Sequence, residues 1–376
     1  MKWMKLLLIS GLLASDMVLA DAIPAGPTPN VTSTQEYILP SGAPSDTYLW
    51  TEDYLGFYGY AARTTTYNCN FTELNQTCTH QSNASTITVT LTEQRSQMQH
   101  QIKLQGYFQA YFVAQATDIE PSQICGYHRS LNTGVYTNCS LSDGNKIATN
   151  SRLLTVFIPQ SEMNNLPVGG VWKGSLKLRA QPNGSGAFDY NADITLKGKA
   201  TGKQDIYFPE FNGANPLVQL DLHPTGSVTG NSFAEDVTTL DMCLYDGYNS
   251  NSDSMTLSFS DEGRAGAGRN EGDFSIYNTG TGGTAAAERI DYHLEMFDPH
   301  SKSWMAVKNN NSFVLSAGVN GQDQIRPVRL PSISYPVLCA PTPLRLIVDK
   351  FRVTEKAAGY YKGTLHVEFS PSLNSI

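Results

Sequence analysis

Charged residues are scarce in this 376-residue chain, at 16% of the sequence, and their distribution excludes several kinds of partner. The formal net charge is −8, and neither half of the chain contains a basic stripe, which argues against nucleic acid as a partner. After the first 20 residues, no apolar run is long enough to cross a bilayer as a helix. The sequence therefore predicts neither a nucleic-acid-binding protein nor an integral membrane protein.

The usual arrangements of catalytic and metal-binding residues are also missing. There is no C-x-x-C pair and no Gly-x-Ser-x-Gly motif, and the adjacent acids Glu52 and Asp53 should point apart, unlike the paired carboxylates of a glycosidase. No His-x-x-x-His pair occurs among the scattered histidines, which are His80, His100, His128, His223, His293, His300 and His366. We therefore expect no catalytic residues, no metal site and no cofactor, and a protein that is not an enzyme.

Residues 1–20 have the features of a secretory signal peptide. Lys2 and Lys5 precede the apolar stretch from Leu6 to Ala14, and Val18-Leu19-Ala20 fits the small-residue cleavage rule. The six cysteines are even in number, as expected of an exported chain. Several connectivities are possible, and proximity in the sequence favours the pairs Cys69–Cys78, Cys125–Cys139 and Cys243–Cys339.

Apolar residues alternate with a period of two, which is typical of half-buried antiparallel strands. In the first half this pattern is clear in Ser85–Thr92, Gln101–Val113 and Leu154–Ile158, and no amphipathic stretch of helical length interrupts it. In the second half, short strands are expected at Leu217–Leu222, at Leu240–Leu244 and in several later segments. The sequence predicts an all-β protein.

A short polar segment, Lys197–Gln204, divides the chain. It contains two glycines and no large apolar side chain, which is typical of a domain boundary. We expect two immunoglobulin-like β-sandwich domains in tandem, residues 21–202 and residues 203–376. The shortness of the boundary predicts that the two domains stay close and roughly coaxial.

The last strand of the second domain suggests that this sandwich is incomplete. Its residues on one face are Tyr361, Gly363, Leu365, Val367 and Phe369, and only a polar tail follows. A chain that ends on a strand belonging inside a sheet leaves an apolar groove beside an unpaired edge, which a strand from a partner can fill. We expect these five residues to line such a groove, and a complete sandwich is the alternative.

A dense run of aromatic residues lies near the start of the first domain: Tyr48, Trp50, Tyr54, Phe57, Tyr58 and Tyr60. In an exported protein, such a run can form a surface on which sugar rings stack. The simpler interpretation is that about half of these side chains fill the sandwich core.

Four segments together resemble a known family. They are Leu166–Trp172, Leu240–Asn249, Tyr335–Cys339 and Gly359–Phe369. This combination resembles the CblD-like minor pilins, which are tip adhesins and biogenesis initiators of alternate chaperone–usher fimbriae (class 5, colonisation-factor type). The resemblance covers most of the mature chain and is sharpest in the second half.

The resemblance implies a location and a set of partners. The protein would pass through the periplasm to the cell surface and lie at the tip of a fimbrium. Its partners would be a periplasmic chaperone, an outer-membrane usher, the major pilin subunit as strand donor, and a host-cell surface glycan or glycoprotein.

In the colonisation-factor adhesins, receptor contact depends on arginines at the outer end of the first domain. Arg63, shortly before the first cysteine, occupies a comparable place. The paired arginines that follow the later Leu-x-Leu strand are absent here, and only Arg179 is near, which puts the same receptor in doubt. Arg129 and His128, beside Cys125, are further candidates.

Two other functions are compatible with the sequence. The chain could be a purely structural initiator that caps the fibre without binding a specific receptor, and Arg63 and Arg179 would then be dispensable for adhesion. It could also be a secreted carbohydrate-active enzyme on a sandwich scaffold, but no pair of convergent carboxylates can be named for that role.

Overall fold

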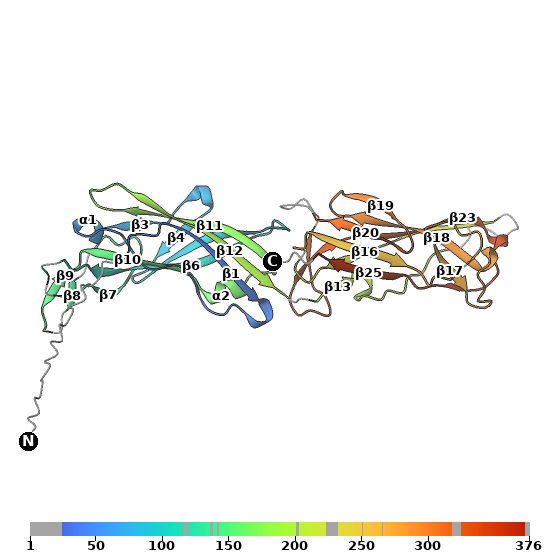
Figure 1. Ribbon diagram of the computed structural model, residues 1–376, viewed down its shortest axis with the longest axis horizontal. Helices are drawn as coiled ribbons and strands as arrows, with labels where there is room; N and C mark the ends of the chain where they lie inside the picture. Colours follow the sequence, from blue (N-terminus) through green and yellow to red (C-terminus); the bar gives the residue numbers. More distant parts are fainter. Residues whose placement is uncertain are drawn as a thin grey trace, which may run out of the picture.

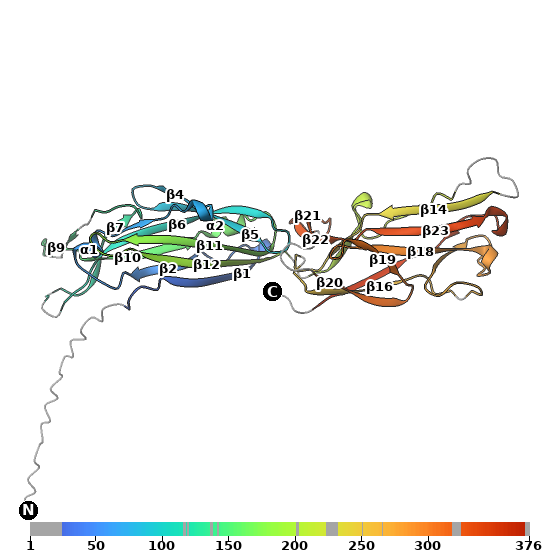
Figure 2. The same cartoon turned by 90° about the horizontal axis from the view of Figure 1, so that it is seen from above.

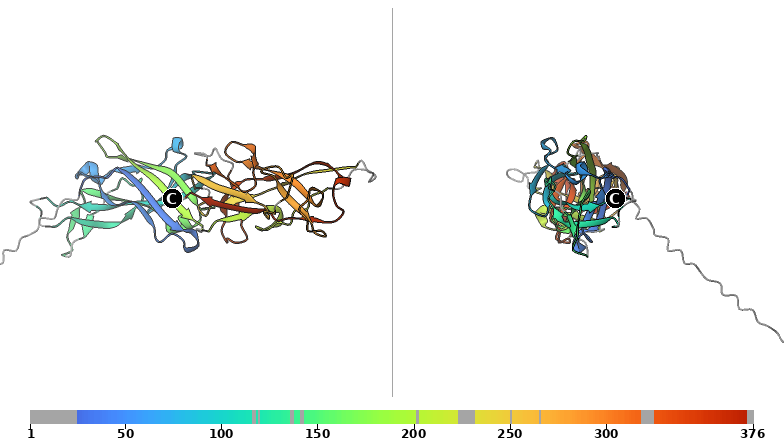
Figure 3. Two further views of the ribbon diagram at one scale, coloured as in Figure 1. Left: turned by 45° about the vertical axis from the view of Figure 1, so that its right-hand side comes forward. Right: turned by 90° about the vertical axis from the view of Figure 1, so that its left-hand side faces the viewer.

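The computed structural model is an elongated molecule in which two β-sandwich domains follow each other end to end (Figures 1 and 3). It describes residues 25–372 apart from 116–117, 119, 136–137, 141–142, 201–202, 223–231, 250, 265 and 318–324, so the signal peptide at 1–20 lies outside the described residues. Among these residues, no helix is long and apolar enough to span a membrane. The predicted all-β, two-domain architecture is confirmed.

The first domain is built around one extended, strongly curved sheet (Figure 2). Its main strands, in spatial order, are β1 (Asn30–Ile38), β12 (Phe188–Lys199), β11 (Gly170–Gln181), β5 (Ser85–Glu93), β6 (Gln99–Phe112), β10 (Ser151–Ile158) and β2 (Thr47–Tyr54). Shorter strands flank them: β3 (Thr66–Asn68) beside β11, β4 (Thr77–His80) beside β5, β7 (Gln123–Arg129) beside β6, and the pair β8 (Asn138–Ser140) and β9 (Lys146–Ala148). Two short helices complete the domain, α1 (Tyr60–Arg63) and α2 (Gln160–Asn164).

The alternation seen in the sequence decides which side chains enter the first core. In β5, Ile87, Val89 and Leu91 are fully buried while the intervening threonines are half-buried. All pairings in this sheet are antiparallel except that of β1, which runs parallel to β12 along one edge.

The second domain contains three small sheets. The six-stranded sheet holds β14 (Phe233–Leu240), β23 (Leu344–Arg352), β18 (Arg289–Asp298), β17 (Phe274–Asn278), β24 (Tyr361–Lys362) and β19 (Ser303–Val307). The three-stranded sheet has the order β20 (Asn311–Ser316), β16 (Ser254–Ser260) and β25 (His366–Pro371), and Figure 1 shows β25 at its edge. The four-stranded sheet next to the first domain has the order β13 (Asp205–Tyr207), β15 (Cys243–Tyr245), β22 (Val337–Pro341) and β21 (Arg326–Val328).

Three predictions about strands in the second half need correction. The strand expected at Leu240–Leu244 is interrupted, because β14 ends at Leu240 and β15 of another sheet begins at Cys243. The final strand is likewise split, since β24 pairs with β17 and β25 pairs with β16. Leu217–Leu222 is extended but belongs to none of the described sheets. In each case the local pattern predicted an extended chain but not the strand with which it pairs.

The cysteines pair as proximity in the sequence suggested. Disulfides join Cys69 to Cys78 and Cys125 to Cys139 within the first domain, and Cys243 to Cys339 in the second. The third bridge spans 96 positions of the sequence and connects the neighbouring strands β15 and β22. Closing so long a loop should stabilise the fold by roughly 4–5 kcal/mol in the chain-entropy view.

The two domains share a packed interface. Tyr245, Leu338 and Cys339 of the second domain belong to the same buried apolar cluster as the first-domain core. The amide of Asn249 is fully buried: its Nδ2 donates to the Gly198 carbonyl of the first domain at 3.4 Å, and its Oδ1 accepts from the Leu338 N–H at 3.1 Å. Arg95 also donates across the boundary to the Ser252 carbonyl at 2.8 Å. These contacts hold the domains in line, as their short connection predicted.

His293 on β18 lies between two carboxylates of the second domain. Its Nδ1 is 2.9 Å from Asp273 and its Nε2 is 2.7 Å from Asp349. Because carboxylates only accept hydrogen bonds, both ring nitrogens must donate, which requires the imidazolium form. Burial by itself would lower the pKa of His293, but the hydrogen bond to Asp349 and the charge of Asp273 outweigh burial and raise it.

We expect the stability that His293 provides to depend on pH. A raised folded-state pKa gives stabilisation that is complete below the ordinary value of about 6.5 and is lost as pH rises through the folded-state value. Replacing His293→Gln should therefore lower the melting temperature at about pH 5.5 and change it much less at about pH 9. Thermal unfolding of both proteins across this range measures the difference, and an equal loss at both ends would contradict the linkage.

Candidate functional sites

The end of the first domain that faces away from the second, here called the distal pole, is formed by α1, the hairpin tip 182–187 and the segment 130–135. β11 starts beside the domain interface, where Gly169 lies against Asn249, and ends at Gln181 next to the hairpin tip. Figure 1 shows this hairpin reaching the same end of the molecule as α1. A hydrogen bond of 3.4 Å from Asn183 Nδ2 to the Tyr60 hydroxyl joins the tip to α1.

Arg152 on β10 holds the distal pole together from inside. Its side chain is 1% exposed, and its guanidinium donates to four backbone carbonyls, those of Arg63, Thr65, Thr133 and Val135. It also lies over the Phe108 ring, 3.8 Å from the centroid. Burial lowers the pKa of Arg152 to about 10, so the group stays protonated at neutral pH. One buried cation therefore fixes both α1 and the segment 130–135.

The structure places Arg63 and Arg179 at this pole, in different electrostatic settings. Arg63 ends α1, and its guanidinium lies 5.3 Å from the centroid of the exposed Tyr60 ring. Arg179 on β11 forms two hydrogen bonds with Asp189, of 2.7 and 3.0 Å. The hydrogen bond from Arg179 is the largest cause of the lowered pKa of Asp189, about 2. Asp189 therefore neutralises much of the positive charge of Arg179.

His128 and Arg129 are on β7, which approaches the pole from the other side. The His128 ring stacks on Tyr107 at 3.8 Å between centroids. Leu131, two residues after Arg129, accepts from the N–H of Tyr67 on β3, and β3 in turn pairs with β11. The fold thus brings all four candidates into the distal half of the first domain.

The aromatic run near the start of the domain divides between core and surface. Trp50 and Tyr54 are buried, whereas Tyr48, Tyr58 and Tyr60 are each about half exposed, at 50%, 48% and 58%. Phe57 is half-buried, and its ring meets that of Phe188 edge-on with 6.5 Å between centroids. The core interpretation therefore holds for Trp50 and Tyr54, and sugar stacking by the exposed rings stays a prediction.

Phe57 and Phe188 line an open hollow of about 510 Å³, here called the distal hollow. Leu55 is its buried floor, and its other lining residues include Pro27, Pro182 and Ser185. This volume is in the range of small-molecule sites. The hollow could not be predicted from the sequence, because its two halves are more than 120 residues apart; the aromatic run was the only signal of it.

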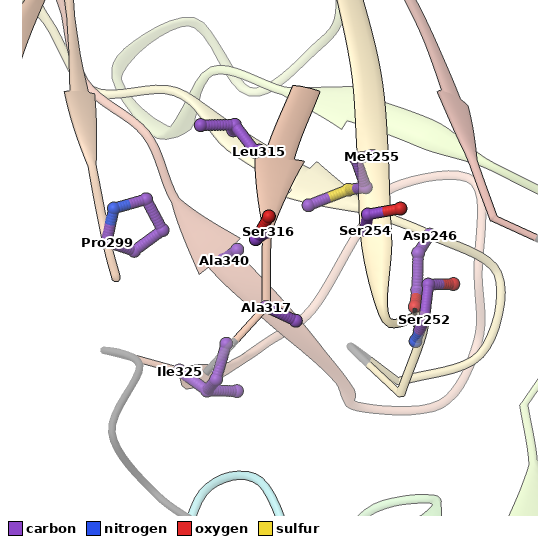
Figure 4. A pocket seen from close by; sticks show the side chains of 10 residues that line it. All are labelled: Asp246, Ser252, Ser254, Met255, Pro299, Leu315, Ser316, Ala317, Ile325 and Ala340. Atoms are coloured by element: carbon purple, nitrogen blue, oxygen red, sulfur yellow. Dashed lines mark hydrogen bonds between the residues drawn. The ribbon is translucent and has the colours of Figure 1, made fainter. Parts of the chain in front are cut away.

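A second cavity, in the second domain, is much smaller (Figure 4). It has a volume of about 20 Å³ and is lined by residues that include Asp246, Ser252, Met255 and Leu315. This is room for about one water molecule and for nothing larger.

Among the described residues, one group of potential ligands is close enough to share a metal ion, but it does not form a metal site. That group is Cys69, Cys78 and His80, and its two sulfur atoms are joined in a disulfide. Thiolates are the form of cysteine that binds metals, so this group cannot act as a ligand set.

The residues predicted to line a groove in the second domain keep their expected parity. Tyr361, Gly363, Leu365, Val367 and Phe369 are half-buried, while the residues between them are exposed. Leu365, Val367 and Phe369 pack against the second core cluster without being enclosed by it. In the described part of the chain, β25 pairs only with β16, which leaves its other edge open.

The extended segment 216–222 carries a similar row of half-buried apolar side chains. Pro216, Val218, Leu220 and Leu222 are half-buried and alternate with exposed residues, the last three of them in contact with the second core cluster. The Asp221 N–H donates to Asp236 of β14 at 3.1 Å, which places the segment beside that strand. Two apolar rows in this domain, on 216–222 and on β25, are thus only half covered.

Comparison with known proteins identifies the family. One family model, described as the first domain of CfaE, a CFA/I fimbrial subunit, matches residues 19–201, and another, described as the second domain of CfaE, matches residues 204–373. The CFA/I fimbrial protein CfaE of Escherichia coli is 29% identical over 293 residues, which are 77% of this chain and 72% of the relative.

Two solved structures share the fold. The crystal structure of CfaE, the adhesive subunit of CFA/I fimbria of enterotoxigenic Escherichia coli, gives a TM-score of 0.65 at 24% identity over 95% of each chain. A structure of the chaperone–tip adhesin complex of CFA/I fimbriae biogenesis gives 0.52 at 24% identity, over 95% of this chain and 99% of that chain.

The architecture and these matches define a class: a two-domain adhesive subunit of chaperone–usher fimbriae, located at the fimbrial tip on the cell surface and not an enzyme. Within that class, the chain belongs to the CfaE family of CFA/I fimbrial proteins. The resemblance to CblD-like minor pilins is thereby confirmed.

Proposed function

We propose that this protein binds a host-cell surface glycan through the distal pole of residues 21–202, and that residues 203–376 form an incomplete pilin domain. In this proposal the major pilin subunit donates the missing strand, so the adhesin starts the fibre and remains at its tip. The proposal that residues 203–376 form an incomplete domain rests on the pair of half-covered apolar rows on β25 and on 216–222.

A strand inserted between these rows would complete both of them. It could pair with the open edge of β25 and bury Leu365, Val367 and Phe369 on one side, and Val218, Leu220 and Leu222 on the other. Such an open edge beside apolar side chains is a site of aggregation unless it is covered.

Assembly partners follow from the same groove. We infer that a periplasmic chaperone covers it first and that the outer-membrane usher then exchanges the chaperone for the pilin strand. A related tip adhesin has been solved in complex with its chaperone, which supports the chaperone step of this proposal.

The receptor half of the proposal is tested at Arg63. Arg63→Ala should reduce the adhesion of fimbriated bacteria to host cells about ten-fold or more, the effect of removing one central arginine contact. Arg179→Ala should have a smaller effect, because Asp189 already holds that side chain. Adhesion counts at equal fimbriation, checked by electron microscopy, measure both variants.

The alternative role, a purely structural initiator, predicts a different outcome. The ion pair of Arg179 with Asp189 favours it in part, because it makes one candidate contact structural. If Arg63→Ala, Arg129→Ala and His128→Ala all leave adhesion unchanged while fimbriae still assemble, the chain initiates fibres without binding a receptor through these residues.

A further inference from the structure

We propose that the distal hollow binds one uncharged sugar ring of the receptor through an apolar face, while Arg63 contacts another part of the same glycan. This inference rests on the proposed function of the first domain as the receptor-binding domain. It assigns the ligand to a chemical class, the neutral hexoses. It places the ligand between Pro27, the residues before α1 and the β11–β12 hairpin.

The volume of the hollow is sufficient for one or two pyranose rings. Its volume of about 510 Å³ lies within the range of small-molecule sites, and its opening faces solvent. Phe57 and Phe188 present aromatic surface at an interplanar angle of 68°, and Leu55 closes the floor. A pyranose has one face made of C–H groups, which packs favourably on such apolar and aromatic walls.

Polar groups surround this apolar floor. Ser185 lines the hollow directly, and the exposed hydroxyl of Tyr60 is hydrogen-bonded to Asn183 at the adjoining tip. These groups can donate to and accept from sugar hydroxyls. An apolar floor with a few convergent polar groups is the usual composition of a ligand site.

The charges beside the hollow favour a neutral ligand over a sialylated one. Asp53 lies two residues before Leu55 and accepts from the N–H of Thr28, next to Pro27. Asp189 follows Phe188 on β12 and therefore points to the opposite face of the sheet, where it pairs with Lys177 at 3.1 Å and with Arg179 at 2.7 Å. All seven residues that line the hollow are uncharged, so a sugar carboxylate would be buried there without a paired cation, whereas a neutral ring would carry no such cost.

Gly186 offers a way to close the hollow without disturbing the fold. It is among the lining residues, its φ lies outside the left-handed region, and a Cβ there would meet no atom within 4 Å. In Gly186→Leu, the new side chain should occupy the mouth of the hollow. Gly213→Leu is the matched control, because Gly213 lies in the second domain and its added Cβ would be 3.8 Å from the nearest atom.

The experiment uses the full mature chain and two probes, methyl β-galactopyranoside and N-acetylneuraminic acid, in titrations followed by saturation-transfer NMR. We expect the neutral sugar to bind with a millimolar Kd, and Gly186→Leu to weaken it about ten-fold or more while Gly213→Leu leaves it unchanged. Tighter binding of N-acetylneuraminic acid, or equal binding of the neutral sugar by Gly186→Leu, would overturn the inference.

Two further outcomes separate this inference from the proposed function. If bacteria carrying Gly186→Leu adhere to host cells as well as wild type, the hollow is not the receptor site, although the adhesin role stands. If neither the neutral sugar nor N-acetylneuraminic acid binds to the wild-type chain, the sugar assignment is wrong, whereas the loss of adhesion in Arg63→Ala would still test the proposed function.

Discussion

Fusing a donor strand after Ile376 should raise the unfolding temperature of the second domain by about 10 °C or more. A donor lying along β25 would cover the six half-buried side chains of the two apolar rows and bury its own. If about 400 Å² of apolar surface is buried, the gain is about 10 kcal/mol. Ordering a donor of about seven residues offsets at least half of this, leaving roughly 3–5 kcal/mol. The donor sequence would be the leading segment of the major pilin.

The register of the donor strand provides the control for this prediction. A donor shifted by one residue would turn its apolar side chains outward, so it should give little stabilisation. In the host domain, Val367→Thr should reduce the gain, whereas Glu368→Thr should not, because Val367 is half-buried and Glu368 is exposed. Calorimetry with the in-register donor, the shifted donor and no donor separates these cases. If all three proteins melt alike, the second domain is complete without a partner strand.

Arg152→Met should lower the stability of the first domain by about 3–5 kcal/mol and its melting temperature by about 10 °C. The substitution keeps much of the side-chain volume but leaves the carbonyls of Arg63, Thr65, Thr133 and Val135 without their donor. Because these carbonyls belong to α1 and its neighbours, we also expect amide exchange at the distal pole to increase before global unfolding. Hydrogen exchange and thermal melts measure the two effects.

Arg179→Met is the matched control for Arg152→Met. It removes the same group from a side chain that is 43% exposed and bound to one carboxylate, and a solvent-exposed ion pair of this kind contributes little to stability. Arg152→Lys should fall between the two variants, since an ammonium keeps the charge but cannot span four carbonyls. If Arg152→Met and Arg179→Met melt within about 2 °C of each other, Arg152 does not hold the pole together.

The properties that could be predicted from the sequence are mostly local ones. Alternation predicted the strands, and the parity of Tyr361 to Phe369 predicted which side chains face the second core, because side chains on a strand point to opposite faces in turn. Proximity in the sequence predicted the pairs Cys69–Cys78 and Cys125–Cys139, and Cys243–Cys339 followed because these are the two cysteines of the second half. The family followed from four segments, Leu166–Trp172, Leu240–Asn249, Tyr335–Cys339 and Gly359–Phe369, which together resemble one family.

The sequence by itself determined the all-β class, the two domains and the half-covered face of the last strand, because each depends on the order of residues within one segment. Only the tertiary structure decided that Leu55 and Phe57 meet Phe188 in one hollow, and that Arg152 is buried among four carbonyls. It also decided that Asp189 holds Arg179. These contacts join strands far apart in the chain, and their register depends on how whole sheets curve and pack, which no local pattern encodes.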